Sequence, residues 1–556
     1  MAIAKRARAK LGCRNMHSHG DFIVGVHVAQ VIAKRSVIAV GREPGRELVM
    51  GSGATDTAPE AGLAYGESAG RWVLAATVLG SSLTFVDTTV VNIALPTIGK
   101  DLDAGLSGLT WTVNAYTLTL ACLILLGGSL GDRLGRRRVF MVGVLWFALA
   151  SMLCGLALNV EMLIASRALQ GVGGALLTPG SLAILQSSFR PADRARAIGA
   201  WSGLAGIAGA AGPFLGGWLI GVASWRWIFL INVPVAFAVL LIANRHVPES
   251  RDPAASHHTD MAGAGLVVVG LAALTYGLIA WPKEGLGAPS VWGSLAAGVS
   301  AIGGFLAWEA TAKDPMLPLG VFASRVFSAT NAVTFAVYAA LGGVFFWLVL
   351  ALQVVAGYTP LEAGVSLLPV TLIMLALSAW AGALSQRIGP RIPMAAGPIL
   401  AAVGVAGLTR MGPAASYVSD VLVPVSVFGC GLSLTVAPLT ATALASVPES
   451  NAGLASGVNN AAARVAGLLA VAVLPLVAGL SGQSYTDPAV LEPAFRTVMW
   501  VCVGLLVTGG LLSAVFVRAP QISPRTTPVG PARAPLPVRR YCPVDGPPLA
   551  ASTNRS

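Results

Sequence analysis

The chain has 556 residues, of which 55% are hydrophobic and 11% are charged, and its formal net charge is +12. Soluble domains carry about 25% charged residues, so this composition excludes an ordinary soluble protein and indicates a polytopic membrane protein. The positive charge does not indicate a nucleic-acid partner, because the excess lies largely at the two ends of the chain. Residues 1–71 hold ten Lys and Arg against six acids, and residues 518–556 hold six against one.

The two ends differ in composition from the rest of the chain. Residues 1–71 are basic and unpatterned and show no secretory signal peptide, so we expect a disordered cytoplasmic tail. We also expect translation to start at or near Met50, which precedes a short polar stretch. The Pro- and Arg-rich residues 518–556 predict a second disordered cytoplasmic tail. The cysteines form no CxxC pair, so neither a metal site nor a disulfide framework is expected.

Between the tails, apolar runs of about twenty residues alternate with charged or Pro/Gly-rich loops. They predict an all-α protein with fourteen transmembrane helices, near residues 72–95, 109–130, 139–158, 162–187, 197–221, 226–244, 261–281, 290–311, 326–353, 362–385, 392–412, 419–446, 452–480 and 495–517. Placing both termini in the cytoplasm leaves thirteen Lys or Arg in the inner loops and five at the outer side. The positive-inside rule therefore favours this topology.

The first span contains one carboxylate, Asp87, about eight residues or roughly 12 Å from the outer end. A charge at that depth is unfavourable by several kcal/mol and usually functional. The alternative is a carboxyl that reaches the surface or stays protonated. We expect Asp87 to face the cavity. Asn92 lies about 140° around the helix from Asp87, so we expect it to brace a neighbouring helix instead of facing the same cavity.

A basic loop follows the second span and is echoed 254 residues later. In the pattern Gly-x-x-x-Asp-Arg-x-Gly-Arg-Arg, the first glycine is expected to let two helices approach closely. The charged residues predict a network that locks two halves of the protein together at the cytoplasmic side. The alternative is an arginine cluster that only sets topology. The first copy contains Gly128, Asp132, Arg133, Gly135, Arg136 and Arg137, and the second contains Gly382, Arg387, Gly389 and Arg391, with Gln386 in place of the acid.

This repeat predicts two six-helix bundles, residues 72–244 and 326–517, separated by two inserted helices in residues 245–325. Repeated halves are a transporter architecture with the substrate site at their interface.

The fourth span places Arg167 and Gln170 on one helix face, about 8 Å below the outer surface. Buried charges are expected to pair, and Arg167 is the one deep cation of the first half. We therefore predict that Asp87 and Arg167 lie close together, where charge attraction and desolvation oppose each other as a proton carrier requires. Independent placement of the two residues is the alternative.

In the fifth span, small residues at close spacing predict backbone-to-backbone packing, and the proline predicts a kink. Ordinary packing without a mechanism is the alternative. The residues in question are Gly209, Gly212, Pro213, Gly216 and Gly217.

The second half holds one deep charge, Arg464, with no deep acid in spans 9–14 to pair with it. We expect solvation by Asn459 and Asn460, contact with substrate, or a structural tie to backbone carbonyls. Asn331 and Tyr338 share a face of the ninth span. Together these suggest a cavity wall made of Asn114, Gln170, Asn331, Tyr338, Gln353 and Arg464.

Several of these motifs resemble known signatures. The loop Gly128–Arg137 is similar to that of the major facilitator superfamily, and Asp87-Thr-Thr-Val-Val-Asn-Ile-Ala-Leu-Pro96 resembles the first-helix signature of its fourteen-spanner drug:H+ antiporters. Trp111–Tyr116, Asp314–Phe322 and Leu352–Pro360 also resemble that branch. The resemblance implies that Asp87 is the embedded carboxylate and Arg167 the fourth-helix arginine. It also implies that the segment Gly212-Pro-Phe-Leu-Gly-Gly217 is a determinant of export direction, and that spans 1, 4, 9 and 12 line the cavity.

Together the residues and the resemblance predict a proton-coupled exporter of drugs, antibiotics or similar lipophilic molecules in the plasma membrane. We expect a monomer that uses the proton gradient, with no cofactor, metal, enzymatic activity or nucleic-acid partner. Export of a single endogenous metabolite is the alternative, and a non-transporting membrane sensor or scaffold is a third. An ATP-driven pump is disfavoured because the pair Gly99-Lys100 does not fit a phosphate-binding loop. Asp101 follows the pair, and Ala94 stands where such a loop needs glycine. A channel is disfavoured because repeated halves suit alternating access.

Overall fold

The computed structural model describes residues 62–251, 260–447 and 452–517. These residues belong to one compact unit, Ala61–Ser556. Fourteen described helices are long and apolar enough to cross a membrane, which confirms the predicted number. The predicted tails before residue 62 and after residue 517, and the proposed start at Met50, lie outside the described residues.

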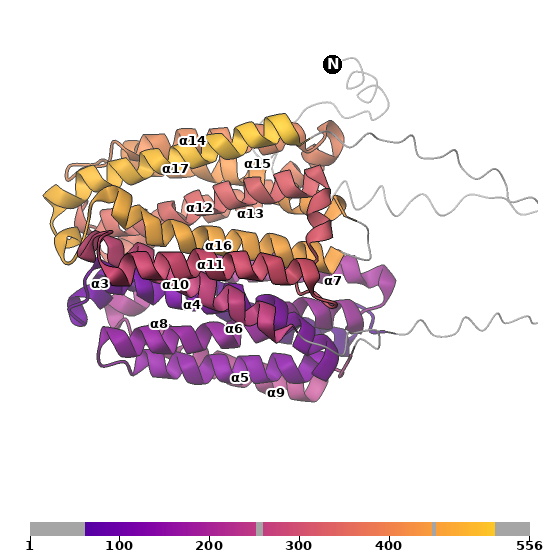
Figure 1. The fold of residues 1–556 in the computed structure, drawn as a ribbon. Coiled ribbons are helices and arrows are strands. Elements are labelled where there is room, and N and C mark those ends of the chain that lie inside the picture. Colours follow the sequence, from indigo (N-terminus) through magenta and orange to yellow (C-terminus); the bar gives the residue numbers. More distant parts are fainter. Residues whose placement is uncertain (1–61, 252–259, 448–451, 518–556) are drawn as a thin grey trace, which may run out of the picture. The chain divides into compact units, whose positions relative to one another are not determined.

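Two bundles of six spans make up most of the described chain (Figure 1). The N-terminal bundle contains α3 (Ser68–Asp101), α4 (Leu106–Leu134), α5 (Arg136–Gly155), α6 (Val160–Ser188), α7 (Pro191–Val222) and the pair α8 (Trp227–Leu230) and α9 (Asn232–His246), which form one span. The C-terminal bundle contains α12 (Arg325–Val354), α13 (Pro360–Ile388), α14 (Arg391–Leu408), α15 (Val423–Ala445, preceded by the π-helical turn η2, Tyr417–Leu422), α16 (Ala452–Ala478) and α17 (Pro488–Phe516). Two short 3₁₀ turns, η1 (Leu319–Ala323) and η4 (Ser484–Thr486), lie in connections.

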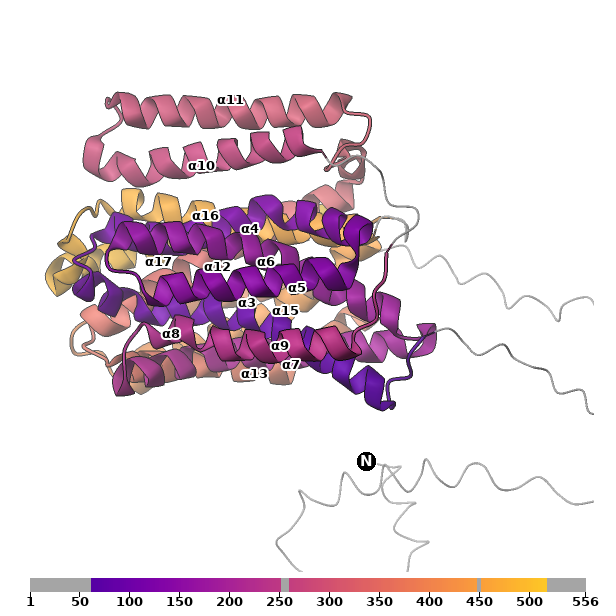
Figure 2. The same ribbon diagram turned by 90° about the horizontal axis from the view of Figure 1, so that it is seen from below.

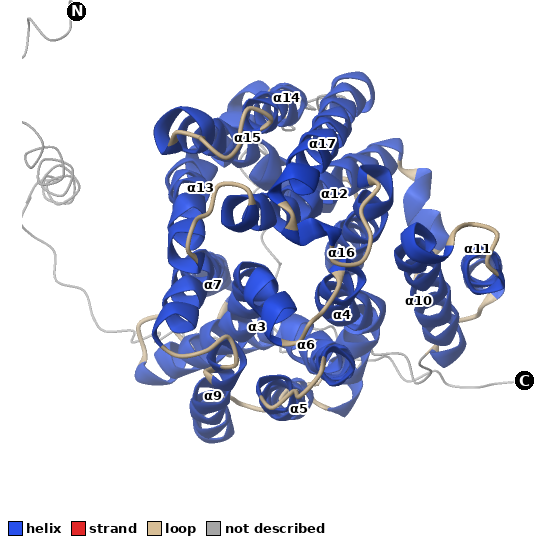
Figure 3. Ribbon diagram, turned by 90° about the vertical axis from the view of Figure 1, so that its left-hand side faces the viewer, coloured by secondary structure: helices blue, strands red, loops and turns tan. Residues whose placement is uncertain are grey.

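The two inserted helices, α10 (Met261–Glu284) and α11 (Pro289–Thr311), lie outside the two bundles (Figure 2). Viewed along the helices, they stand beside α4 and α16, where the two bundles meet (Figure 3). α10 packs against both of these helices, whereas α11 packs mainly on α10. The insert therefore covers one edge of the seam between the bundles.

Capping side chains and glycines determine where several helices begin and end. Thr359 and Glu362 form a capping box at the start of α13, and the side chain of Asn159 caps α6. Gly135 and Gly389 end α4 and α13 with φ values of +116° and +83°, a backbone conformation that glycine adopts without strain. These two glycines are the equivalent positions of the repeated loop, so their conformation explains why both copies retain glycine there.

One predicted boundary is wrong. Residues 62–67 were expected to belong to a disordered tail, yet Leu63 donates its backbone N–H to the carbonyl of Ser188 at 2.8 Å, and the Tyr65 N–H donates to Asp193 Oδ2 at 3.1 Å. α3 begins at Ser68 rather than at residue 72. A short polar segment gives no periodic signal, so this docking could not be read from the sequence.

The close helix contact after the second span involves a different glycine from the one expected. A Cβ on Gly127 would lie 2.1 Å from the carbonyl oxygen of Ala175 on α6, whereas a Cβ on Gly128 would meet Pro179 at an ordinary 3.6 Å. The approach of α4 to α6 therefore depends on Gly127. Gly128 has room for a side chain.

We expect Gly127→Ala to lower the thermal stability of the detergent-purified protein by an equivalent of about 1–3 kcal/mol, because the added methyl group forces the two backbones apart. Gly128→Ala is the matched control, and its helix propensity predicts no loss. Thermal unfolding of both variants beside the wild type tests this. Equal melting temperatures for the two variants would contradict the assignment.

Candidate functional site

Asp87 of α3 and Arg167 of α6 form an ion pair in the interior of the N-terminal bundle. Arg167 Nη1 lies 2.5 Å from Asp87 Oδ2, which confirms the predicted proximity. Each residue is only 1% exposed. The pairing follows from the sequence pattern, because a buried ion without a partner is strongly unfavourable.

A network of polar groups surrounds this pair. Gln170, one helical turn after Arg167, donates its amide to Asp87 Oδ1 at 2.8 Å and accepts from Arg167 Nη1 at 2.6 Å. The same amide group donates to the hydroxyl of Ser151 at 3.1 Å, and Ser151 also accepts from Asn232 at 2.9 Å. Four helices, α3, α5, α6 and α9, thus hold the carboxylate in a fixed position.

Arg167 also has neutral partners from α4 and α8. Its Nε donates to the backbone carbonyl of Thr112 at 3.1 Å, and its guanidinium carbon lies 4.3 Å from the ring centroid of Tyr116 and 5.7 Å from that of Phe229. A cation over an aromatic face is stabilised electrostatically. Arg167 therefore keeps favourable contacts that do not depend on the charge of Asp87.

These contacts define what the site can do chemically. With an ionised Asp87, both carboxylate oxygens are hydrogen-bonded and the pair is neutral overall. With a protonated Asp87, Arg167 retains the Gln170 oxygen, the Thr112 carbonyl and the Tyr116 ring. Arg167 therefore keeps partners that do not change when the carboxyl takes up a proton, which favours reversible proton binding.

The predicted position of Asp87 on a cavity wall is wrong for this conformation. Its side chain has no exposed area, because Arg167 and Gln170 cover it. The expected bracing by Asn92 is also wrong, since its amide donates at 3.4 Å to the Thr88 carbonyl of its own helix. Sequence reasoning also missed Ser151 and Asn232, whose small polar side chains lie within apolar spans where hydropathy does not single them out.

Thr89 instead joins α3 to α7. Pro213 has no N–H, so the carbonyl of Gly209, four residues earlier, lacks its helical donor. The hydroxyl of Thr89 donates to that carbonyl at 3.1 Å. A Cβ on Gly212 would lie 2.0 Å from the same hydroxyl, and one on Gly216 would lie 3.2 Å from Val90. The helix continues through Pro213 to Val222.

Gly217 and Gly364 connect the two bundles. A Cβ on Gly217 would lie 2.6 Å from the backbone of Leu361 on α13, and one on Gly364 would lie 2.3 Å from the carbonyl of Pro213 on α7. The glycines of the fifth span therefore serve two interfaces. Gly209, Gly212 and Gly216 face α3, and Gly217 faces the other bundle.

Four hydrogen bonds join the bundles at the end where α3 leads into α4, here called the α3–α4 end. Gln353 donates to the Ile93 carbonyl at 2.9 Å, so this predicted cavity residue ties α12 to α3. The other three bonds join the loop after α3 to the loop before α17: Leu106 N–H to the Gly482 carbonyl (2.8 Å), Gln483 to Asp103 Oδ1 (3.0 Å) and the Tyr485 hydroxyl to the Ala104 carbonyl (2.9 Å). This end of the seam is closed.

The first basic loop lies at the opposite end, where α4 leads into α5. Arg136 Nε donates to Asp132 Oδ1 at 2.8 Å, and the Arg137 backbone N–H donates to Glu249 Oε1 at 3.1 Å. The Glu249 carboxylate also lies so close to Gly135 that a Cβ there would meet it at 2.7 Å. These bonds link the loop to the chain after α9, within the N-terminal side of the protein.

The second basic loop makes fewer bonds. Arg391 Nε donates to the carbonyl of Ala514 on α17 at 2.7 Å. A Cβ on Gly382 would meet nothing within 4 Å, so close helix contact does not account for this glycine. The side chain of Arg387, in the last turn of α13, makes none of the described hydrogen bonds or ion pairs.

Among the other predicted cavity residues, Asn331 has a hydrogen-bond partner, whereas Asn114 and Arg464 have buried polar atoms without one. Asn331 accepts from Asn459 at 3.3 Å, and Asn459 also donates to Thr334 at 2.7 Å, so the expected solvation of Arg464 by Asn459 is wrong. Asn460 donates to the Ser456 carbonyl of its own helix. The amide of Asn114 and the Nε of Arg464 are buried and make no hydrogen bond.

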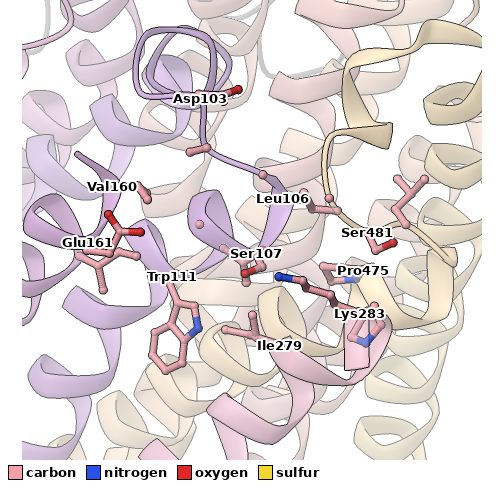
Figure 4. A pocket seen from close by; sticks show the side chains of 18 residues that line it. Asp103, Leu106, Ser107, Trp111, Val160, Glu161, Ile279, Lys283, Pro475 and Ser481 are labelled. Atoms are coloured by element: carbon pink, nitrogen blue, oxygen red, sulfur yellow. The ribbon is translucent and has the colours of Figure 1, made fainter. Parts of the chain in front are cut away.

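A pocket of about 340 Å³ opens at the α3–α4 end between α4, α6, α10 and the loop after α16. Trp111, Glu161, Lys283 and Ser481 are among the residues that line it (Figure 4). None of the predicted site residues lies in its wall. It is therefore separate from the Asp87 network.

Two six-helix bundles with an insert at their seam, and a charge pair buried in one bundle, define a membrane transporter. The chain belongs to the Major Facilitator Superfamily, whose family model matches residues 77–471.

Three proteins illustrate its relatives. The tetracenomycin C resistance and export protein of Streptomyces glaucescens is 36% identical over 416 residues, covering 74% of this chain and 77% of the relative. The multidrug resistance protein Stp of Mycobacterium tuberculosis (strain CDC 1551 / Oshkosh) is 35% identical and covers 77% of this chain and 80% of its own length. The puromycin resistance protein pur8 of Streptomyces alboniger is 35% identical and covers 80% and 91%.

Solved structures share the fold at low sequence identity. The inward-open xylose transporter XylE from E. coli is 14% identical with a TM-score of 0.56, and it covers 81% of this chain and 97% of its own. The POT family transporter PepTSo is 15% identical with a TM-score of 0.59, and it covers 81% of this chain and 98% of its own. These neighbours agree with a two-bundle transporter fold.

The energetic link between Asp87 and Arg167 can be measured with a double-mutant cycle. We expect Arg167→Gln to destabilise the protein by roughly 3–5 kcal/mol, because it leaves Asp87 buried and unpaired. Adding Asp87→Asn to that variant should restore part of the loss, giving a coupling energy of about 1–3 kcal/mol. Thermal unfolding of the wild type, both single variants and the double variant checks this, and simple additivity would contradict it.

Proposed function

We propose that this protein is a proton-coupled exporter that alternates between two conformations, with Asp87 as the proton carrier. The observation that carries the proposal is the fully covered Asp87–Arg167–Gln170 network, in which Arg167 also has a partner, Gln170, that does not depend on the charge of Asp87. A membrane-embedded carboxylate of this kind is a functional site by default.

The distribution of charged loops supports the orientation of the proposal. Basic residues concentrate at the end where α4 leads into α5, so this end faces the cytoplasm of a cell with the protein in its plasma membrane. Both chain termini then lie inside, and the closed α3–α4 end faces outward. The conformation described here is accordingly closed toward the outside, with Asp87 paired to Arg167.

A transport cycle follows from these positions. The inward-facing protein takes up substrate while Arg167 holds the ionised Asp87. Separation of the bundles at the α3–α4 end breaks the bonds of Gln353 and Gly482 and gives outside protons access to the Asp87 network. Protonation weakens the hold of Arg167 on Asp87 and accompanies substrate release. Return to the inward-facing state releases the proton inside.

The substrate class comes from the relatives. Their names concern resistance to and export of antibiotics, which supports export of drug-like or antibiotic small molecules by this chain. Relatives named for one compound each, tetracenomycin C and puromycin, support export of a single metabolite as the second candidate. We propose that the protein acts as a monomer driven by the proton gradient without a cofactor, enzymatic activity or nucleic-acid partner.

We expect Asp87→Asn to abolish substrate-induced proton movement in proteoliposomes and resistance in a pump-deficient host, while membrane insertion persists. The amide cannot exchange a proton at this position. Asp101→Asn is the matched control, because Asp101 is a partly exposed carboxylate that binds Arg226 at the closed end. Coupled transport by Asp87→Asn at the wild-type rate would refute the proton-carrier assignment.

The pH profile of transport gives a second test. Arg167→Ala removes the positive charge that is paired with Asp87, so the balance between the two protonation states of the site changes. The pH profile of transport should therefore shift in this variant. Proton-driven dye efflux from vesicles across a pH series measures the shift, and an unchanged profile would contradict the functional role of the pair.

A further inference from the structure

Arg464 is a second membrane-embedded cation, and the proton-carrier network does not use it. It lies near the middle of α16, a 27-residue helix that crosses the membrane. Its Nε is buried without a hydrogen-bond partner, and no carboxylate of the described residues forms an ion pair with it. Arg167, by contrast, has the Asp87 carboxylate and two further acceptors.

The helices packed against α16 bring no acid to this depth. α16 contacts α4, α10, α12, α15 and α17. α15 has no charged residue. The charged residues of the other four helices lie toward the helix ends: Asp132, Arg133, Lys283, Glu284, Arg325, Glu492 and Arg496. Asp87 is already bound by Arg167 and Gln170. The charge of Arg464 is therefore uncompensated by the described part of the protein.

Both bundles contribute to the surroundings of Arg464. Val465 and Leu468 pack with Leu118 and Cys122 of α4. On the other side, α16 touches α12 backbone to backbone, since a Cβ on Gly342 would lie 2.9 Å from the Cα of Gly467. Arg464 thus stands at the seam between the two bundles, where transporters of repeated halves hold their substrate.

Two tyrosines accompany the guanidinium at this seam. Tyr116 of α4 and Tyr338 of α12 belong to two helices that pack against α16. Tyr116 is 1% exposed, and its hydroxyl lies within hydrogen-bonding reach of the Thr88 side chain on α3. The buried Nε of Arg464 has no such partner, which is unfavourable unless a ligand completes it. The Arg464 side chain itself keeps some accessibility, so a ligand can reach it.

We propose that Arg464 is the counter-ion for a negatively charged group, a carboxylate, phenolate or enolate, on the exported molecule. The hydroxyls of Tyr116 and Tyr338 then donate to the same group, and the apolar seam holds the rest of an aromatic or aliphatic body. This proposal rests on the exporter function above and names its substrate class as lipophilic organic anions. Cations are disfavoured there by the charge of Arg464.

Matched ligand pairs test the charge preference. 2-Naphthoate and its neutral carboxamide differ in charge at nearly equal size, and fluorescein and rhodamine 123 share a scaffold with opposite charge. Binding to the purified full-length protein is followed by tryptophan quenching or thermal shift. We expect the wild type to bind each anion about tenfold more tightly than its partner, the contribution of one charge-assisted hydrogen-bonded contact.

Variants then assign the preference to Arg464. In Arg464→Gln the affinity ratio should fall close to one, and Arg464→Lys, which keeps the charge, should restore a clear preference for the anion. Arg496→Gln is the control, because it removes an arginine from an exposed pair with Glu492. A wild type without anion preference, including one that binds none of the anions, or an unchanged ratio in Arg464→Gln would overturn the proposal.

Two further measurements distinguish a failure of this anion-binding proposal from a failure of the proposed exporter function. Without ligand, Arg464→Gln should leave the melting temperature unchanged or raise it, since it removes an uncompensated charge; a marked decrease would indicate a structural role and contradict the proposal. Asp87→Asn should lose proton coupling yet retain the anion preference. Coupled transport in Asp87→Asn would refute the proton-carrier role, whereas loss of charge discrimination in Arg464→Gln would still support the substrate class.

Discussion

The ion pair between Asp87 and Arg167 is the interaction on which the N-terminal bundle depends. Isolated charges are strongly unfavourable within a membrane, and this pair is held by groups from five helices, α3, α4, α5, α6 and α9. Because Arg167 also has neutral acceptors and an aromatic face, protonation of Asp87 does not leave it without partners. The contacts that stabilise the ion pair therefore also favour reversible proton binding at Asp87.

Close backbone packing joins helices within the N-terminal bundle and at one place across the seam. Glycines let α4 approach α6, α7 approach α3, and α7 approach α13 across the seam. Thr89 supplies the hydrogen bond that Pro213 removes from α7. The bonds between the bundles at the α3–α4 end involve few residues and mainly backbone carbonyls. Such a seam can open without disturbing the interior of either bundle.

Hydropathy and loop charge were sufficient to predict fourteen helices and two repeated halves, because the membrane requires long apolar helices. The Asp87–Arg167 contact was predictable because two deep charges in one half have few alternatives. Ser151, Asn232 and Thr89 were not, since their role depends on which faces of neighbouring helices meet. The assignment of close packing to Gly128 instead of Gly127 failed for the same reason. A sequence motif does not show which of two adjacent glycines faces the neighbouring helix.

The central claim is that Asp87 exchanges a proton within its network. Infrared difference spectroscopy of the purified protein across a pH titration measures this directly, because a protonated carboxyl absorbs apart from a carboxylate. We expect the wild type to show a pH-dependent carboxylic-acid component that is lost in Asp87→Asn and shifts in Arg167→Ala. A titrating band that remains unchanged in Asp87→Asn would contradict the account.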